Sequence, residues 1–123
     1  MRGFILLVAL ILPIVSQAQT FSYDKPAVLY GKLLKIKSLH PNQELFGGNQ
    51  IAVALDRVIE VDGAEGLVKT KLIQLIDMNE SRYSMLFKKE GMPVAIACEA
   101  LFRGHTAHHT TKVLCVVKAL QFK

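Results

Sequence analysis

The chain has 123 residues, with 15 Lys and Arg against 10 Asp and Glu and a formal net charge of +5. This length fits one domain rather than two, and the scattered basic residues do not predict a nucleic-acid-binding surface, which needs basic residues clustered on one face. Beyond the N-terminal residues, no apolar run approaches the roughly 20 residues that span a membrane. We therefore expect a single small domain.

Residues 1–18 are predicted to be a secretory signal peptide. A basic second residue precedes an apolar run from Phe4 to Val15, and the small residues Ser16 and Ala18 fit a cleavage site. The run is too short for a membrane-spanning helix, and no Cys follows it that would carry a lipid anchor. The mature chain, residues 19–123, is expected to be one soluble domain in the periplasm or outside the cell.

Three strands are predicted in the first half of the mature chain. Apolar residues alternate with polar ones over Ala27–Ile36, Ile51–Val61 and Leu67–Ile76. Gly31 inside the first strand indicates a bulge or a sharp bend. A loop over residues 38–49 joins the first two strands, and a Gly-containing turn joins the second and third into a hairpin.

A short helix and a final hairpin are predicted in the second half. Asn79 is a favourable helix N-cap and Gly91 a favourable C-terminal stop. Two further strands follow, with alternating apolar residues over Val94–Phe102 and Val113–Ala119. A wide polar tip rich in His and Thr joins them.

This order of elements predicts a mainly β fold. Three strands, one helix and two strands are the order of a small five-stranded Greek-key barrel of the OB type, with its short helix between strands three and four. The alternative is an open antiparallel sheet with one packed helix. The bend indicated by Gly31 favours the barrel, because the first strand of such a barrel serves both of its sheets.

Cys98 and Cys115 are expected to form a disulfide, because the cysteine count is even and an exported protein meets an oxidising compartment. If the hairpin folds about its centre near residues 106 and 107, Cys98 falls opposite Cys115. The bridge would then contribute about 3 kcal/mol to stability. The alternative is a pair of buried thiols that act as small apolar side chains.

Two segments resemble a bacterial family of small exported proteins that is known only as a domain of unknown function. These are Ser22–Leu33 (SYDKPAVLYGKL) and His105–Thr110 (HTAHHT). Members of that family carry an H-T-G-H-H-H-T-P segment before the last strand. Here Thr110 replaces its third consecutive His, and Lys112 falls near its Pro. The resemblance implies an envelope location and supplies no activity; if the family's histidines bind a metal, this chain lacks one ligand.

The four histidines fall in the two loops that commonly flank the binding cleft of an OB barrel. They are His40, His105, His108 and His109. Imidazole is the commonest metal ligand, so these rings are candidate ligands of zinc or copper, with Glu44 as a further carboxylate. Their spacing matches no stereotyped metal motif. Two alternatives stay open: solvated loop residues, or a structural tip whose His and Thr side chains bond to the backbone.

The tip between the last two strands is also the candidate partner-binding loop. Its candidate contact residues are Arg103, His105, Thr106, His108, His109 and Thr110. Residues 51–77 contain none of the aromatic side chains on which single-stranded nucleic acid stacks, so nucleic acid is not an expected partner. An envelope protein is the favoured partner, with a small molecule in an apolar cleft between the loops as a weaker alternative.

The sequence contains no H-E-x-x-H, no G-x-S-x-G and no glycine-rich phosphate loop. Cys98 lies mid-strand on an apolar face, which does not suit a nucleophile. We interpret Asp56 and Arg57, which interrupt the second strand, as a surface ion pair or a barrel-rim contact. The expected function is a non-enzymatic exported binding module of inhibitor or immunity type, with no cofactor. The alternative is a zinc- or copper-binding envelope protein.

Overall fold

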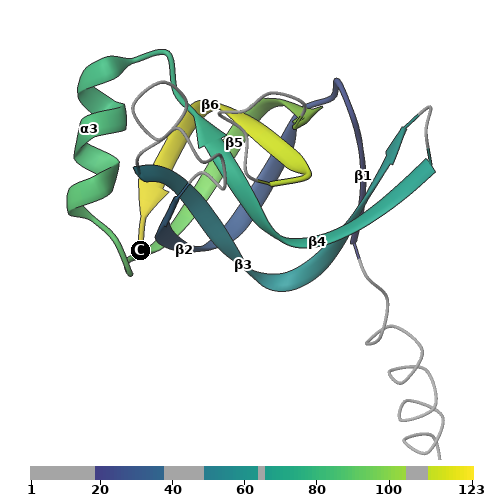
Figure 1. The fold of residues 1–123 in the computed structure, drawn as a ribbon, viewed down its shortest axis with the longest axis horizontal. Helices are drawn as coiled ribbons and strands as arrows, with labels where there is room; N and C mark the ends of the chain where they lie inside the picture. The colour runs from purple at the N-terminus through teal and green to yellow at the C-terminus, as the bar shows by residue number, and fades with distance from the viewer. Residues whose placement is uncertain (1–18, 38–48, 64–65, 105–110) are drawn as a thin grey trace, which may run out of the picture.

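The computed structural model describes residues 19–37, 49–63, 66–104 and 111–123. Within these residues the chain forms strands and one helix, in the order β1 Gln19–Ser22, β2 Ala27–Lys37, β3 Asn49–Gly63, β4 Gly66–Ile76, α3 Glu80–Lys88, β5 Pro93–Arg103 and β6 Val113–Phe122 (Figure 1). No helix in this part of the chain is long and apolar enough to cross a membrane.

Five strands close into a barrel. Their order around the barrel is β3-β2-β5-β6-β4, and β4 pairs with β3 to complete the ring. Every neighbouring pair is antiparallel except β4 and β6, which are parallel. The helix α3 follows β4 and precedes β5, and so lies between the third and fourth strands of the barrel. The predicted mainly β fold is confirmed, and the arrangement is consistent with the OB type.

β1 is an additional strand that the sequence pattern does not predict. It pairs in parallel with β3, from Gln19 opposite Ile59 to Ser22 opposite Asp62. Just after it, the Tyr23 N–H donates to the Asp62 carbonyl at 3.0 Å. Four residues are too few to show a period of two. Long-range pairing with β3 therefore makes this segment a strand.

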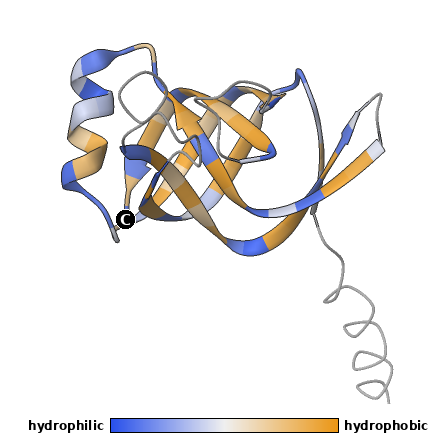
Figure 2. Cartoon of the chain, viewed as in Figure 1, coloured by the Kyte–Doolittle hydropathy of each residue, from blue (hydrophilic) through white to orange (hydrophobic). Residues whose placement is uncertain are grey.

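Alternation of apolar and polar residues places the core inside the barrel. In β2, Ala27, Leu29 and Leu33 are buried, while Val28 and Tyr30 face outward and are about half exposed. The apolar residues lie mainly on the strands, and α3 is largely polar (Figure 2). In α3 the Leu86 side chain is fully buried in the core cluster, and the partly buried Tyr83, Met85 and Phe87 pack against that cluster. The helix therefore contributes one fully buried side chain, and its other side chains on the same side as Leu86 cover the barrel.

The disulfide between Cys98 and Cys115 is confirmed, with the two Cα atoms 5.4 Å apart. The register expected for the hairpin is wrong. Cys98 pairs with Val117, and Cys115 pairs with Leu101. Register shifts on either side of Cys98 mark a bulge in β5, and a bulge bends its strand. Because both cysteines are buried, the bridge lies in the core rather than on the surface of the hairpin.

An ion pair fixes the start of α3 to the barrel. The Arg82 guanidinium forms two hydrogen bonds to the Asp77 carboxylate, and Asn79 caps the helix by accepting from the Arg82 N–H at 3.0 Å. Arg82 also donates to the Val117 and Lys118 carbonyls of β6. Burial opposes ionisation of Asp77, but the hydrogen bonds from Arg82 and from the Asn79 N–H outweigh it and lower the pKa of this carboxyl.

Asp77→Asn is expected to lower the free energy of unfolding by about 2 to 3 kcal/mol, because it leaves the Arg82 charge without its partner. The lowered pKa also fixes the pH dependence. A carboxyl with a lower pKa in the folded state stabilises the fold above about pH 4, and this stabilisation is lost as the pH falls through the folded-state pKa. Urea unfolding at pH 6 and pH 3 checks both effects. The exposed Asp56→Asn is the control; an equal loss in both variants would contradict the assignment.

Candidate functional site

Most of the residues proposed from sequence as a site lie outside the described part of the chain. These are His40, Glu44, His105, Thr106, His108, His109 and Thr110. Arg103, the last residue of β5, is described and is exposed. No group of three or more His, Cys, Asp or Glu within the described residues could hold a metal ion. The metal site and the partner-binding loop therefore stay predictions.

The residues that follow the two histidine-bearing segments are nevertheless held together. Gln50 lies just after residues 38–48, and Thr111 directly follows residues 105–110. Both bond to Gln74 of β4: its Nε2 donates to Gln50 Oε1 at 3.4 Å, and its backbone N–H donates to Thr111 Oγ1 at 3.0 Å. We call Gln50, Gln74 and Thr111 the loop-base cluster. It holds Gln50 and Thr111, the described residues that follow the two segments, against the same residue of β4.

Two further hydrogen bonds make this cluster rigid. The Thr111 hydroxyl donates to the Val113 carbonyl at 2.6 Å, which fixes the entry into β6. The Tyr83 hydroxyl of α3 donates to Gln50 Oε1 at 3.0 Å. Burial raises the pKa of Tyr83, against a smaller opposite effect of a backbone hydrogen bond from Ile51, so its hydroxyl stays a donor at neutral pH. Gln74 itself is only 1% exposed.

A pocket opens elsewhere on the barrel, where β2 and β3 separate. The two strands pair from Lys37 opposite Asn49 to Gly31 opposite Leu55, and the ladder stops there. At this last pair the backbones approach closely: a Cβ on Gly31 would lie 2.1 Å from the carbonyl oxygen of Ala54. Only glycine fits such an approach. Beyond it, residues 27–30 of β2 pair with β5 alone.

On the other side of the pocket, β3 bulges outward. Its pairing with β4 shifts register between Ala54 and Ile59. The residues between them include Asp56, Arg57 and Val58, all of which are exposed. Bulges of this kind aim side chains away from the ladder and often lie next to binding sites. The interruption of the apolar pattern in the sequence therefore corresponds to a structural feature.

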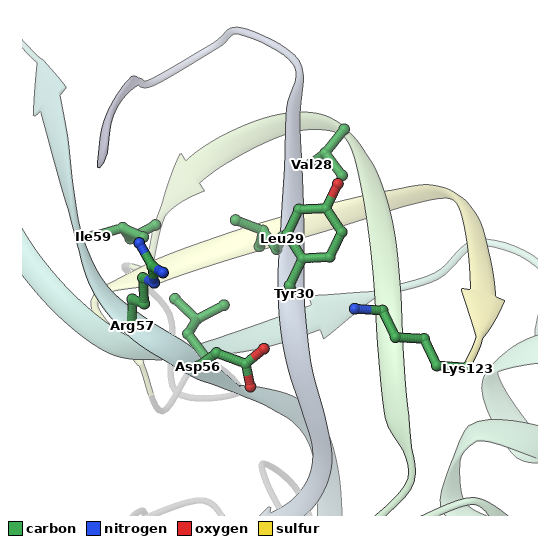
Figure 3. A pocket seen from close by; sticks show the side chains of 8 residues that line it. Val28, Leu29, Tyr30, Asp56, Arg57, Ile59 and Lys123 are labelled. Carbon is green, nitrogen blue, oxygen red and sulfur yellow. The ribbon is translucent and has the colours of Figure 1, made fainter. Parts of the chain in front are cut away.

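We call the space between these segments the β2–β3 pocket, and it has a volume of about 320 Å³. Its lining combines buried apolar, half-exposed and charged side chains: Val28, Leu29, Tyr30, Leu55, Asp56, Arg57, Ile59 and Lys123 (Figure 3). The Lys123 ammonium lies 4.8 Å from the centre of the Tyr30 ring. The pocket thus offers an apolar inner wall and a rim with two cations and one carboxylate.

The predicted ion pair between Asp56 and Arg57 is not present. The structure gives ion pairs to Lys35, Lys69 and Arg82, and within the described residues none involves Asp56 or Arg57. Both groups therefore remain available to a ligand, and their position at the edge of the β2–β3 pocket agrees with the other interpretation, a contact at the barrel rim.

Sequence reasoning singled out Gly31, Asp56 and Arg57 but did not bring them together. Gly31 and the Asp56–Arg57 pair are each visible as exceptions to an alternating pattern. Their proximity follows from the β2–β3 register, which only the folded chain fixes. Lys123 had no distinguishing sequence context at all.

Residues 72–121 match the model of a family described as domain of unknown function (DUF4431). A search of curated proteins found no match to the chain. The predicted likeness to an uncharacterised family is confirmed. The bacterial origin of that family and its histidine-rich segment stay predictions. The matched residues include the second half of β4, all of α3 and β5 and nearly all of β6, but none of the residues that line the β2–β3 pocket.

Proposed function

We propose that this barrel, whose residues 72–121 match a family of unknown function, is a non-enzymatic exported domain that binds another protein of the cell envelope. Inhibitors of hydrolases and immunity-type partners of toxins are proteins of this kind, because they act by binding and not by catalysis. The observation that carries the proposal is the loop-base cluster. Binding residues commonly lie on loops that a rigid scaffold positions, and Gln74 binds Gln50 and Thr111, which follow the two histidine-bearing segments in the sequence.

The disulfide supports an extracytoplasmic location. Structural disulfides persist in oxidising compartments and are rare in the cytosol. The bridge between Cys98 and Cys115 is buried in the core, as a structural bridge is. Together with the predicted signal peptide over residues 1–18, it favours export.

Within the described residues, the titratable groups with shifted pKa values have structural partners. Among the described residues, the shifted pKa values belong to Asp77, Arg82 and Tyr83, and each of these side chains is engaged in hydrogen bonds that hold α3 to the barrel. Catalytic groups with shifted pKa values typically lie in a cleft where a substrate can reach them. None of these three lines the β2–β3 pocket.

Site-specific photo-crosslinking in the exporting organism tests the proposal. A benzophenone amino acid at Lys112, which is exposed beside the loop-base cluster, is expected to capture one specific envelope protein. The same amino acid at Lys88 of α3, also exposed, is the matched control and is expected to capture none. Capture of the same proteins from both positions, or of none from Lys112, would contradict recognition at the loop end.

Thr111→Val tests the contribution of the cluster to that surface. The change leaves the buried Gln74 N–H without its acceptor and removes the hydrogen bond to the Val113 carbonyl. We expect a loss of about 2 kcal/mol in stability and weaker crosslinking from Lys112. Urea unfolding measures the first effect. Thr20→Val, which removes only an exposed hydrogen bond to Glu60, is the control and should leave the urea midpoint nearly unchanged.

A zinc and copper titration of the mature protein separates the alternative function. Calorimetry is performed beside a His105→Ala/His108→Ala variant. Tight one-to-one binding that the variant loses would assign the histidines to a metal site and replace the protein-binding proposal. Absence of binding would leave them as contact or turn residues.

A further inference from the structure

The β2–β3 pocket has the properties of an unfilled position in a sheet. β2 presents a free edge over residues 27–30, because these residues pair with β5 on one side and with no described strand on the other. Four strand residues extend over about 13 Å. A free strand edge carries unpaired backbone donors and acceptors and is a template for another strand. Extended peptides bind many proteins by adding to such an edge.

The charged side chains at the rim of the β2–β3 pocket favour an acidic peptide. Arg57 is exposed and forms no ion pair with a described residue, and the Lys123 ammonium lies over the face of Tyr30. Against these two cationic side chains, the acidic side chain in the lining is that of Asp56. Without the predicted signal peptide, which contains Arg2, the chain has 14 Lys and Arg against 10 Asp and Glu, and this net charge of +4 adds long-range attraction for an acidic partner. An arginine in this position is also the preferred residue for holding a carboxylate by two hydrogen bonds.

The apolar inner wall of the pocket determines which side chains a bound peptide needs. Leu29, Leu55 and Ile59 line the pocket from the core side, and each is nearly fully buried. Side chains of a strand alternate between the two faces of a sheet. A strand placed beside β2 would therefore direct one side chain toward this apolar wall and its two neighbours outward, toward Arg57 and Lys123. The volume, about 320 Å³, suits a few residues and not a whole domain.

From these observations we propose that the β2–β3 pocket binds an extended acidic segment of another protein, with the pattern acidic–apolar–acidic, as a short strand added to the free edge of β2. The inference concerns a surface separate from the loop-base cluster. It stands or fails independently of the partner proposed there.

The test is binding of a blocked peptide, acetyl-Gly-Asp-Val-Glu-Gly-amide, to the mature full-length protein, followed by NMR of the protein amides. We expect the largest shifts at the amides of Val28, Tyr30 and Arg57. Arg57→Glu is expected to weaken binding at least about tenfold, because it replaces a charge-assisted hydrogen bond with a repulsive charge. Lys88→Glu in α3 makes the same change of charge away from the pocket and should leave the affinity unchanged.

Two further probes separate strand addition from simple attraction of an anion. Methylation of the central Val nitrogen in the peptide removes one backbone donor and keeps both carboxylates, so it should abolish most of the binding. Succinate carries two carboxylates without a peptide backbone and should not bind. Equal binding of the methylated peptide, or of succinate, would overturn the proposal in favour of a plain anion site.

Three other results would also overturn it. They are the same affinity in Arg57→Glu and in the unchanged protein, shifts confined to amides away from the pocket, and self-association that Arg57→Glu abolishes. The last result would make a second copy of this chain the occupant. Arg57→Gln, which removes the charge without reversing it, should weaken binding less than Arg57→Glu. It keeps the test valid if the charge-reversed protein folds poorly, as thermal unfolding of each variant will show.

Discussion

Gly31→Ala is expected to lower the free energy of unfolding by at least about 3 kcal/mol, the upper range for overpacking, because the new methyl group meets backbone and not a movable side chain. The added Cβ would lie 2.1 Å from the Ala54 carbonyl oxygen and 2.9 Å from the Leu55 Cα. To relieve these contacts β2 must move away from β3. The pair that ends their ladder would then be lost.

Thermal unfolding measures this effect. For a domain of this size, a loss of about 3 kcal/mol corresponds to a melting temperature lower by about 10 to 20 °C. Gly91→Ala is the matched control. Its φ of +87° makes Ala unfavourable, but no atom lies within 4 Å of the added Cβ. We expect the control to cost about 1 kcal/mol; an equal loss in the two variants would show that the close approach at Gly31 is not the cause.

Removal of the disulfide is expected to have a comparable effect. The double change Cys98→Ala/Cys115→Ala should destabilise the protein by about 3 kcal/mol, the value that the chain-entropy model gives for a loop of this length. The two cysteines are 17 residues apart in sequence, and both side chains are buried. The variant also loses the sulfur atoms from the core, which adds to the cost.

Urea unfolding with and without dithiothreitol separates the bridge from the packing. Under oxidising conditions the unchanged protein should unfold at a higher urea concentration than the double variant. Addition of dithiothreitol should shift the unchanged protein and leave the variant where it was. If the reductant shifts neither protein and both unfold at the same concentration, the bridge contributes no stability.

Local sequence patterns were sufficient for most of the fold. Alternating apolar residues located the strands from β2 onward, since one face of each strand is buried in the barrel. Asn79 was predicted as the helix N-cap, and its side chain accepts a hydrogen bond from the Arg82 N–H. These features depend on neighbours within a few residues. β1 was not predicted, because it forms a strand only by pairing with Ile59 to Asp62 of β3, some 40 residues away in the sequence.

Pairing partners depend on register, which local patterns do not fix. Cys98 and Cys115 were identified as a bridge, yet the register inferred around residues 106 and 107 was wrong, because the ladder next to the loop already pairs Arg103 with Val113. The β2–β3 pocket was missed for the same reason. It exists because one ladder stops at Gly31 while β3 bulges, and neither event is apparent before the two strands are aligned.

Closure of the barrel depends on its last strand. β6 is the partner of both β5 and β4, and its parallel contact with β4 consists of three residue pairs, from Gln74 opposite Leu114 to Ile76 opposite Val116. Until β6 is available during synthesis, β4 keeps an unpaired edge and the apolar interior is open on that side. The growing chain is therefore prone to aggregation until β6 has been synthesised, and a chaperone that binds it would protect it most during that interval.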